Sequence, residues 1–149
     1  MGIFNAFAIS ASGLTAERLR MDVISNNIAN VNTTRTIDGG PYQRQRVVFE
    51  PRGEKMGFLF PFVFDKTKQT SQFQGVKATG IINDQEPPKM VYDPGHPDAN
   101  KDGYVAMPNV NIVKEMVDMI SATRAYEANV TSINSAKTMA AKALDIGKA

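Results

Sequence analysis

The 149-residue sequence contains no cysteine. This absence excludes a disulfide framework and any metal site built on thiolates, so the fold is expected to be the same in oxidising and reducing compartments. The sequence also lacks a strong excess of charge, because 17 lysines and arginines stand against 15 aspartates and glutamates. A protein that binds nucleic acid or an anionic membrane surface through its charge needs a larger basic excess. Neither partner is therefore expected.

Long apolar runs and a secretory signal are missing as well. The longest apolar run, Met56 to Phe64, is interrupted by Gly57 and Pro61 and is far shorter than the roughly 20 residues that cross a bilayer. The first eleven residues have no basic segment, and polar residues interrupt their apolar ones. We therefore expect a chain that is not inserted in a membrane and is not cleaved at a signal peptide.

The usual signatures of catalysis are absent too. The sequence has no P-loop, no Gly-x-Gly-x-x-Gly segment and no Ser/His/Asp set. His96 is the only histidine, and it lies between Gly95 and Pro97 without a second histidine or a cysteine to share a metal. An enzyme acting through His96 and a nearby carboxylate stays an alternative, but we expect no catalytic residue, no bound metal and no cofactor.

One short segment resembles the start of an EF-hand calcium loop. Asp98, Asn100 and Asp102 supply oxygens at positions 1, 3 and 5, and Gly103 stands at position 6. Position 12 is Asn109, so the bidentate glutamate of such loops is missing. The competing interpretation is a turn rich in Asx residues, with Gly103 at a positive φ. We expect the turn and keep a small calcium-binding module as the alternative.

Long apolar repeats mark both ends of the chain. Apolar residues recur at spacings of three and four, with Ser10 and Glu17 as interruptions near the N-terminus and Thr123 and Lys137 near the C-terminus. This 3.5-residue period predicts two helices that pack along a coiled-coil seam. The predicted seam and assembly residues are Phe7, Leu14, Met21, Ile24, Ile28, Val31, Ile112, Met116, Met119, Tyr126, Val130, Ile133 and Leu144.

Capping and helix-breaking residues predict the helix bounds. We expect the first helix from about Ile3 to about Asn30, where asparagine and threonine become frequent. The last helix is expected to begin after Pro108, with Asn109 or Asn111 as its N-cap, and to end at Gly147.

Between the helices the pattern changes to short extended pieces separated by turn residues. Seven prolines from Pro41 to Pro97 forbid long regular ladders, because each lacks a hydrogen-bond donor. The fold class is therefore mainly α, with residues 1–35 and 109–149 as the helical parts and residues 36–108 as a small β-rich, loop-rich insertion. The expected extended pieces are Tyr42–Phe49, Phe58–Phe64, Gly75–Ile82 and Lys89–Tyr92.

Two further groups of residues are candidates for interfaces. Phe58, Phe60, Phe62 and Phe64 place a large apolar area in seven residues, which either fills the core of the insertion or inserts into a neighbouring molecule. Asn26, Asn27 and Asn30 lie among apolar seam residues. We predict that these asparagines form hydrogen bonds across a tight helix interface between subunits, although fraying of the helix end is the alternative.

Several segments resemble one protein family. The segment 25–33, Ser-Asn-Asn-Ile-Ala-Asn-Val-Asn-Thr, is similar to the N-terminal signature shared by flagellar rod and hook proteins. The other similar segments are Gly40-Pro41-Tyr42, Val47-Val48-Phe49, 93–97, 103–105, 107–111, Glu115-Met116-Val117 and 121–129. On these residues the chain resembles the flagellar axial proteins over nearly its whole length, and among them the proximal rod proteins of the bacterial basal body.

The resemblance implies a structural subunit that the flagellar type III apparatus exports uncleaved. It implies terminal helices that pair antiparallel and stack into a hollow drive shaft, the rod that crosses the periplasm; the seams alone do not decide that direction. The implied partners are other rod proteins, copies of the chain itself, the export apparatus and ring components of the basal body. Another rod or hook protein is the alternative. The stretch 55–73 looks like an enlargement of the family's middle segment, and we expect it to dock on a neighbouring rod subunit or ring component.

Overall fold

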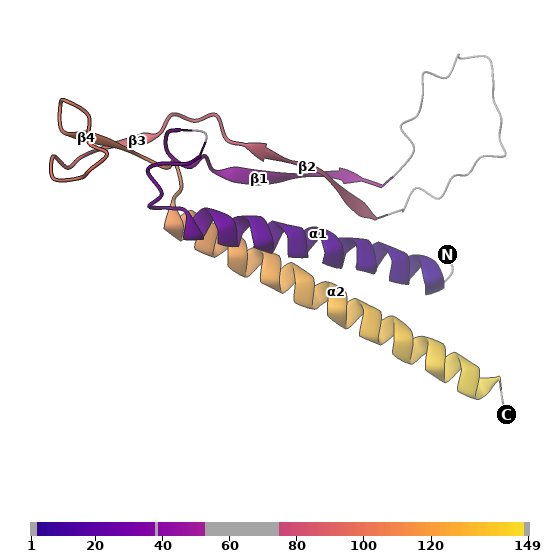
Figure 1. The fold of residues 1–149 in the computed structure, drawn as a ribbon. Helices are drawn as coiled ribbons and strands as arrows, with labels where there is room; N and C mark the ends of the chain where they lie inside the picture. The colour runs from indigo at the N-terminus through magenta and orange to yellow at the C-terminus, as the bar shows by residue number, and fades with distance from the viewer. Residues whose placement is uncertain (1–2, 38, 53–74, 148–149) are drawn as a thin grey trace, which may run out of the picture.

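The computed structural model describes residues 3–37, 39–52 and 75–147. Two long helices lie side by side, and the strands lie along one side of the pair and beyond one end of it (Figure 1). This arrangement confirms the predicted order of helix, β-containing insertion and helix. The elements are α1 (Ile3–Ala29), β1 (Gln45–Pro51), β2 (Val76–Asn83), β3 (Lys89–Tyr92), β4 (Tyr104–Met107) and α2 (Ile112–Ile146).

The two helices run in opposite directions. The Ser10 hydroxyl lies 3.4 Å from the Ser132 hydroxyl, and Asn27 Nδ2 lies 3.0 Å from Glu115 Oε2, so the start of α1 meets the second half of α2 and its end meets the start of α2. The start of α1 and the end of α2 lie at the same end of the pair (Figure 1). The Asn111 side chain accepts hydrogen bonds from the first turn of α2, which makes it the N-cap, and Gly147 ends the helix as predicted.

The face of α2 that packs on α1 differs from the predicted seam. The buried residues of α2 are Glu115, Ala122 and Ala136, each one position before a predicted seam position. A small side chain lets two helix backbones approach closely, and the same closeness appears at Gly13, where an added Cβ would lie 2.9 Å from Asn129 Nδ2.

The large apolar seam residues of α2 therefore turn partly outward. Ile112, Met116 and Leu144 are exposed in the single chain, so for these three positions a seam stays a prediction about the assembled state. Ile24 is buried as predicted. The remaining seam residues are half-buried: Phe7, Leu14, Met21, Ile28, Val31, Met119, Tyr126, Val130 and Ile133.

The four strands form two antiparallel pairs. In the β1–β2 pair Gln45 lies opposite Asn83 and Pro51 opposite Val76, and the register shifts after Val48. The β3–β4 pair aligns its four residues one to one. The predicted strands at Gly75–Ile82 and Lys89–Tyr92 correspond to β2 and β3, whereas β4 was not predicted. The predicted strand Phe58–Phe64 lies outside the described residues.

β1 begins later than predicted because the preceding residues bind elsewhere. The backbone N–H of Tyr42 donates to the Thr33 carbonyl at 3.0 Å, and that of Arg44 donates to Asn109 Oδ1 at 3.1 Å. These bonds direct the N–H groups of Tyr42 and Arg44 toward the segments that follow α1 and precede α2. The Arg44 carbonyl still accepts from the Asp84 N–H, just after β2, and regular pairing with β2 starts at Gln45.

Side chains of α1 hold the outer edges of the β1–β2 pair. Asn27 exchanges two hydrogen bonds with the backbone of Gln45, at 2.8 and 2.9 Å, and the Val76 N–H donates to Ser12 Oγ at 3.1 Å. Backbone groups at the sheet edge that would otherwise be free to pair with another strand therefore have partners there.

No described helix is long and apolar enough to cross a bilayer. Among the described residues, the buried apolar side chains are Ala16, Val23, Ile24, Val105, Ala122 and Ala136, so the core is thin.

Gly75 is required where the sheet crosses α1. Its φ is 86°, and a Cβ there would overlap the Ser12 hydroxyl and lie 3.3 Å from the Ile9 Cα. Gly75→Ala should therefore lower the free energy of unfolding in urea by more than the ~1–2 kcal/mol that a left-handed conformation costs a residue with a Cβ. Gly40→Ala is the matched control, since Gly40 has a φ of 87° and no atom within 4 Å of the added Cβ. Equal losses for the two variants would show that the contact with α1 is not close.

Candidate assembly surface and a buried polar junction

A buried cluster of polar side chains lies where the end of α1, the start of β1 and the first turn of α2 meet. Asn27 and Glu115 are each only 1% exposed. The Asn27 amide donates to Glu115 Oε2 at 3.0 Å and to the Gln45 carbonyl at 2.8 Å, and its oxygen accepts from Gln45 N and the Tyr42 hydroxyl, both at 2.9 Å. All the hydrogen-bonding capacity of the Asn27 side chain is thus used inside the chain.

Arg44 supplies the positive charge of this cluster. Its Nε donates to Glu115 Oε1 at 2.7 Å, and one Nη lies 2.6 Å from the same oxygen. Its guanidinium also lies 3.6 Å from Asp84 and 3.7 Å from Asp118. The Arg44 side chain is 11% exposed, so the ion pair with Glu115 is shielded from water and from salt. We refer to Asn27, Arg44 and Glu115 as the polar junction.

Burial raises the pKa of Tyr42 above its ordinary value of 10.0, and the negative charge of Glu115 adds to this effect. The unfolded chain therefore loses the Tyr42 proton at a lower pH than the folded chain does. The stability that this difference gives is present below pH 10.0 and is lost as the pH rises through the folded pKa.

This pKa shift predicts a steeper alkaline loss of stability in the parent chain than in Tyr42→Phe. Urea unfolding at a series of pH values from 9 upward, on the order of one pH unit on each side of the ordinary tyrosine pKa, measures the two slopes. The comparison concerns the slope, because the phenylalanine variant also loses the hydrogen bond to Asn27. Parallel slopes would show that the Tyr42 hydroxyl ionises alike in the folded and unfolded chains.

The structure changes the predicted role of one of the three asparagines. Asn27 is committed within the chain, so it is not available as a contact between subunits, which corrects that prediction. Asn26 is exposed and donates weakly to Tyr42 and Gln45, while Asn30 donates to the backbone oxygen of Asn26. A role for Asn26 and Asn30 between subunits stays a proposal.

Sequence reasoning missed the ion pair between Arg44 and Glu115. The two residues are 71 positions apart, so no local pattern joins them. The one available signal was a glutamate lying beside the apolar seam of α2. Such a charge is expected either at the surface or with a buried partner, and the second case holds here.

A second surface of α2 faces away from α1 and is rich in large apolar side chains. Ile112, Val113, Met116, Val117 and Ile120 are all exposed, and positions 113, 116, 117 and 120 have the spacing of a single helix face. We call these five residues the outer stripe. The C-terminal end of α2 also exposes Met139, Leu144 and Ile146. α2 thus has one face for α1 and another apolar face that no described residue covers.

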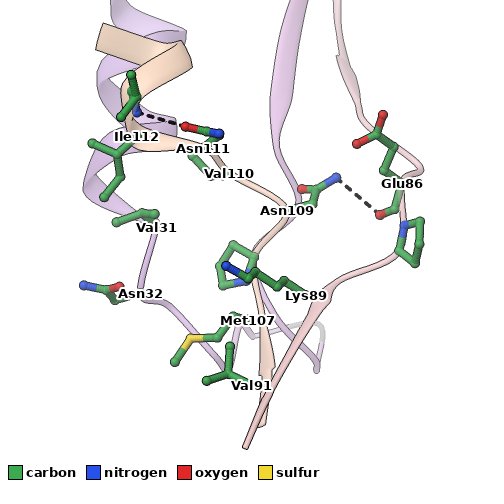
Figure 2. Close-up of a pocket in the computed structure, with 13 residues that line it drawn as sticks. Val31, Asn32, Glu86, Lys89, Val91, Met107, Asn109, Val110, Asn111 and Ile112 are labelled. Atoms are coloured by element: carbon green, nitrogen blue, oxygen red, sulfur yellow. Dashed lines mark hydrogen bonds between the residues drawn. The ribbon is translucent and has the colours of Figure 1, made fainter.

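A groove of about 650 Å³ adjoins the start of the outer stripe. Val31 and Asn32 after α1, Val91 of β3, Met107 of β4 and the first residues of α2 border it (Figure 2). Asn109 Nδ2 donates to the Glu86 carbonyl at 3.3 Å across one side of the groove (Figure 2). The lining mixes apolar side chains with amides and does not include His96, so it suits packing against another protein surface better than bond-breaking chemistry.

The calcium-like segment folds as the predicted Asx turn. Asn100 Oδ1 accepts hydrogen bonds from the N–H groups of Asp102 and Tyr104 at 3.0 and 2.9 Å, and Gly103 has a φ of 79°. Asp98 accepts from the Thr34 hydroxyl at 2.7 Å. Two of the three candidate oxygen donors are therefore engaged in closing or anchoring the loop. Within residues 3–37, 39–52 and 75–147, no group of three His, Cys, Asp or Glu side chains could hold a metal ion.

The lone histidine also serves the loop. His96 Nδ1 accepts a hydrogen bond from the Asp98 N–H at 3.1 Å, which is a local turn contact. An imidazole acting as a general base needs its nitrogen near a proton of a bound substrate, and this nitrogen faces the protein backbone instead.

Comparison with known proteins gives a consistent result. A family described as "Flagella basal body rod protein" matches residues 7–35, and one described as "Flagellar basal body rod FlgEFG protein C-terminal" matches residues 101–146. The chain is 55% identical over 150 residues to flagellar basal-body rod protein FlgC of Borreliella burgdorferi, with 98% of each chain covered. It is 45% identical to the protein of the same name from Bacillus subtilis, with 99% of this chain and 100% of the relative covered, and 39% identical to that of Escherichia coli O157:H7 with the same coverage.

Proposed function

Because the chain belongs to the FlgC family of flagellar basal-body rod proteins, we propose that its helix pair is the part that joins it to the other subunits of the rod. The chain is a structural subunit of the proximal rod of the flagellar basal body, and it is not an enzyme. Its assembly with other rod proteins and with copies of itself gives a helical tube that transmits torque. The exported, uncleaved chain would reach this place through the type III apparatus and lie where the rod crosses the periplasm, beside ring components.

One observation supports the assembly role most directly, the presence of two apolar faces on α2. The first face packs on α1 through small residues, and the second is the outer stripe, which is exposed in the single chain. A contact that joins different faces of successive subunits does not close on itself and produces a tube or a filament. In the assembled rod we expect the helices to form antiparallel coiled coils, with the exposed seam residues Ile112, Met116 and Leu144 buried between subunits.

Electron cryomicroscopy of purified basal bodies tests the location. The expected result is density for the chain in the proximal rod, with the outer stripe in contact with a neighbouring subunit. Density farther along the shaft would favour the alternative of another rod or hook position.

The alternative of a calcium-binding module is tested by calorimetric titration with Ca²⁺. It should give no binding heat, because Asn100 and Asp98 already accept hydrogen bonds within the protein.

The phenylalanine cluster Phe58, Phe60, Phe62 and Phe64 lies outside the described residues, and its role in docking stays a prediction. Removing residues 55–73 should abolish motility while the shortened chain is still exported, if this segment contacts a neighbouring rod subunit or ring component. A swimming assay of the complemented deletion strain, with immunoblots of the exported fraction, measures both effects. Normal swimming would exclude a required contact.

A further inference from the structure

The β1–β2 pair is attached to the helices through few buried apolar contacts. Most of the buried apolar residues that the structure describes lie on the helices, and β2 is exposed along nearly its whole length. The sheet runs alongside α1 with its far end beyond the middle of the helix (Figure 1). Apolar contact alone is non-directional, so a thin contact of this kind would let the sheet swing relative to the helix pair.

Directional contacts are concentrated at the polar junction instead. Arg44 stands immediately before β1, and its planar guanidinium holds Glu115 of α2 through two nitrogens. The other oxygen of Glu115 accepts from Asn27 of α1, which in turn exchanges two hydrogen bonds with Gln45. One closed set of bonds therefore joins α1, β1 and α2. Because the guanidinium fork has fixed geometry, small rotations of the sheet would break these bonds.

The other contacts at this interface restrain the sheet less. The Arg20 guanidinium lies 5.9 Å from the centre of the Phe49 ring, and the Arg20 side chain is 42% exposed. A partly exposed cation–π contact tolerates sliding over the ring face. At the other end of the sheet Ser12 accepts one hydrogen bond from Val76, and the neighbouring Gly75 lies close to α1. These contacts hold one point of the sheet, about which it can still turn.

We propose that Arg44 is a positioning residue, which together with Glu115 and Asn27 fixes the angle at which the β1–β2 pair leaves the helix pair. Apolar residues of similar volume can often replace a buried ion pair without loss of stability, so we infer that this pair contributes more to the choice of one conformation than to net stability. In a rod, a fixed angle would present the sheet to the next subunit in one orientation; that consequence rests on the proposed function, whereas the angle itself is a property of the single chain.

The absence of cysteine makes a direct measurement possible. Cysteines introduced at Thr79 of β2 and Glu127 of α2, both exposed, carry nitroxide labels on the full-length chain. Double electron–electron resonance then reports the distance between sheet and helix. The parent should give one narrow distance. Replacing the ion pair by Arg44→Met together with Glu115→Leu should keep the helical circular dichroism, since apolar residues of similar size can replace a buried pair, but should lose the single narrow distance.

Two further variants complete the design. Arg44→Lys keeps the charge but removes the fork, so it should also broaden the distance, and it decides the question if the double apolar variant does not fold. Glu50→Gln is the matched control, because it removes a surface ion pair with Lys77 from the same strands, and it should leave the narrow distance unchanged. A narrow, unshifted distance in a folded variant without the ion pair would overturn the proposal. The measurement uses purified chain, so failure of rod assembly would not affect it.

Discussion

Val113→Asp combined with Ile120→Asp is expected to abolish swimming while leaving the free subunit folded and exported. Both residues belong to the outer stripe and are exposed in the single chain, so neither change removes a core contact. The local electrostatics of the helix even favour the new charges. An aspartate at position 113 lies in the first turn of α2, at the positive end of its dipole, and one at position 120 is four residues before Arg124.

In the assembled rod the same charges would be buried against a neighbouring subunit. A carboxylate removed from water without a partner costs several kcal/mol, and the variant repeats this cost at every copy of the contact. Motility on soft agar, immunoblots of the exported fraction and electron micrographs of basal bodies separate loss of assembly from loss of export. The control is Lys101→Asp, which introduces an exposed aspartate in the Asx turn, away from the outer stripe. A strain with this variant should swim normally. Normal swimming of the double variant would remove the outer stripe from the assembly surface.

Val113 and Ile120 make a sharper test of assembly than Ile28 and Ile133, the positions that the apolar repeat in the sequence would suggest. Both isoleucines are half-buried along the helix pair of the single chain. A charge at either position would disturb the subunit itself as well as its contacts, so a failure to assemble would have two causes.

The helices could be predicted from sequence because their signals are local. A repeat of period 3.5 continues for many turns, and Asn111 and Gly147 cap α2 where their residue types suggest. The rotation of α2 could not be predicted in the same way. Alanines at 122 and 136 contribute little to an apolar pattern, yet they are the buried apolar residues of α2. The larger side chains beside them dominated the pattern, although several of them are exposed in the single chain.

The polar junction depends on contacts that no local pattern encodes. Arg44 could have been a surface arginine in any loop, and Glu115 lies in the first turn of α2, where a negative charge is favourable without any partner. What makes them a pair is the antiparallel return of the chain, which brings the start of α2 beside the end of α1 and the entry to β1. Long-range geometry of this kind becomes visible only once the helices are placed.

Glu115→Leu alone is expected to be the most destabilising single substitution in the described part of the chain. It leaves the Arg44 guanidinium 11% exposed without its closest carboxylate, and it removes the acceptor of one Asn27 hydrogen bond. Breaking a buried pair in this way typically costs ~3–5 kcal/mol. Asp84 and Asp118 stay within 3.6 and 3.7 Å of the guanidinium, so we expect a loss near the lower end of that range.

Adding Arg44→Met to Glu115→Leu should recover much of the lost stability, because the unpaired charge is then gone. Urea unfolding of the parent, both single variants and the double variant forms a double-mutant cycle, whose coupling energy isolates the interaction between the two side chains. A favourable coupling of on the order of 2 kcal/mol or more would show that the guanidinium and the carboxylate are buried against each other in solution. Additive losses would mean that water reaches both groups, and the polar junction would then have no means of holding the sheet at one angle.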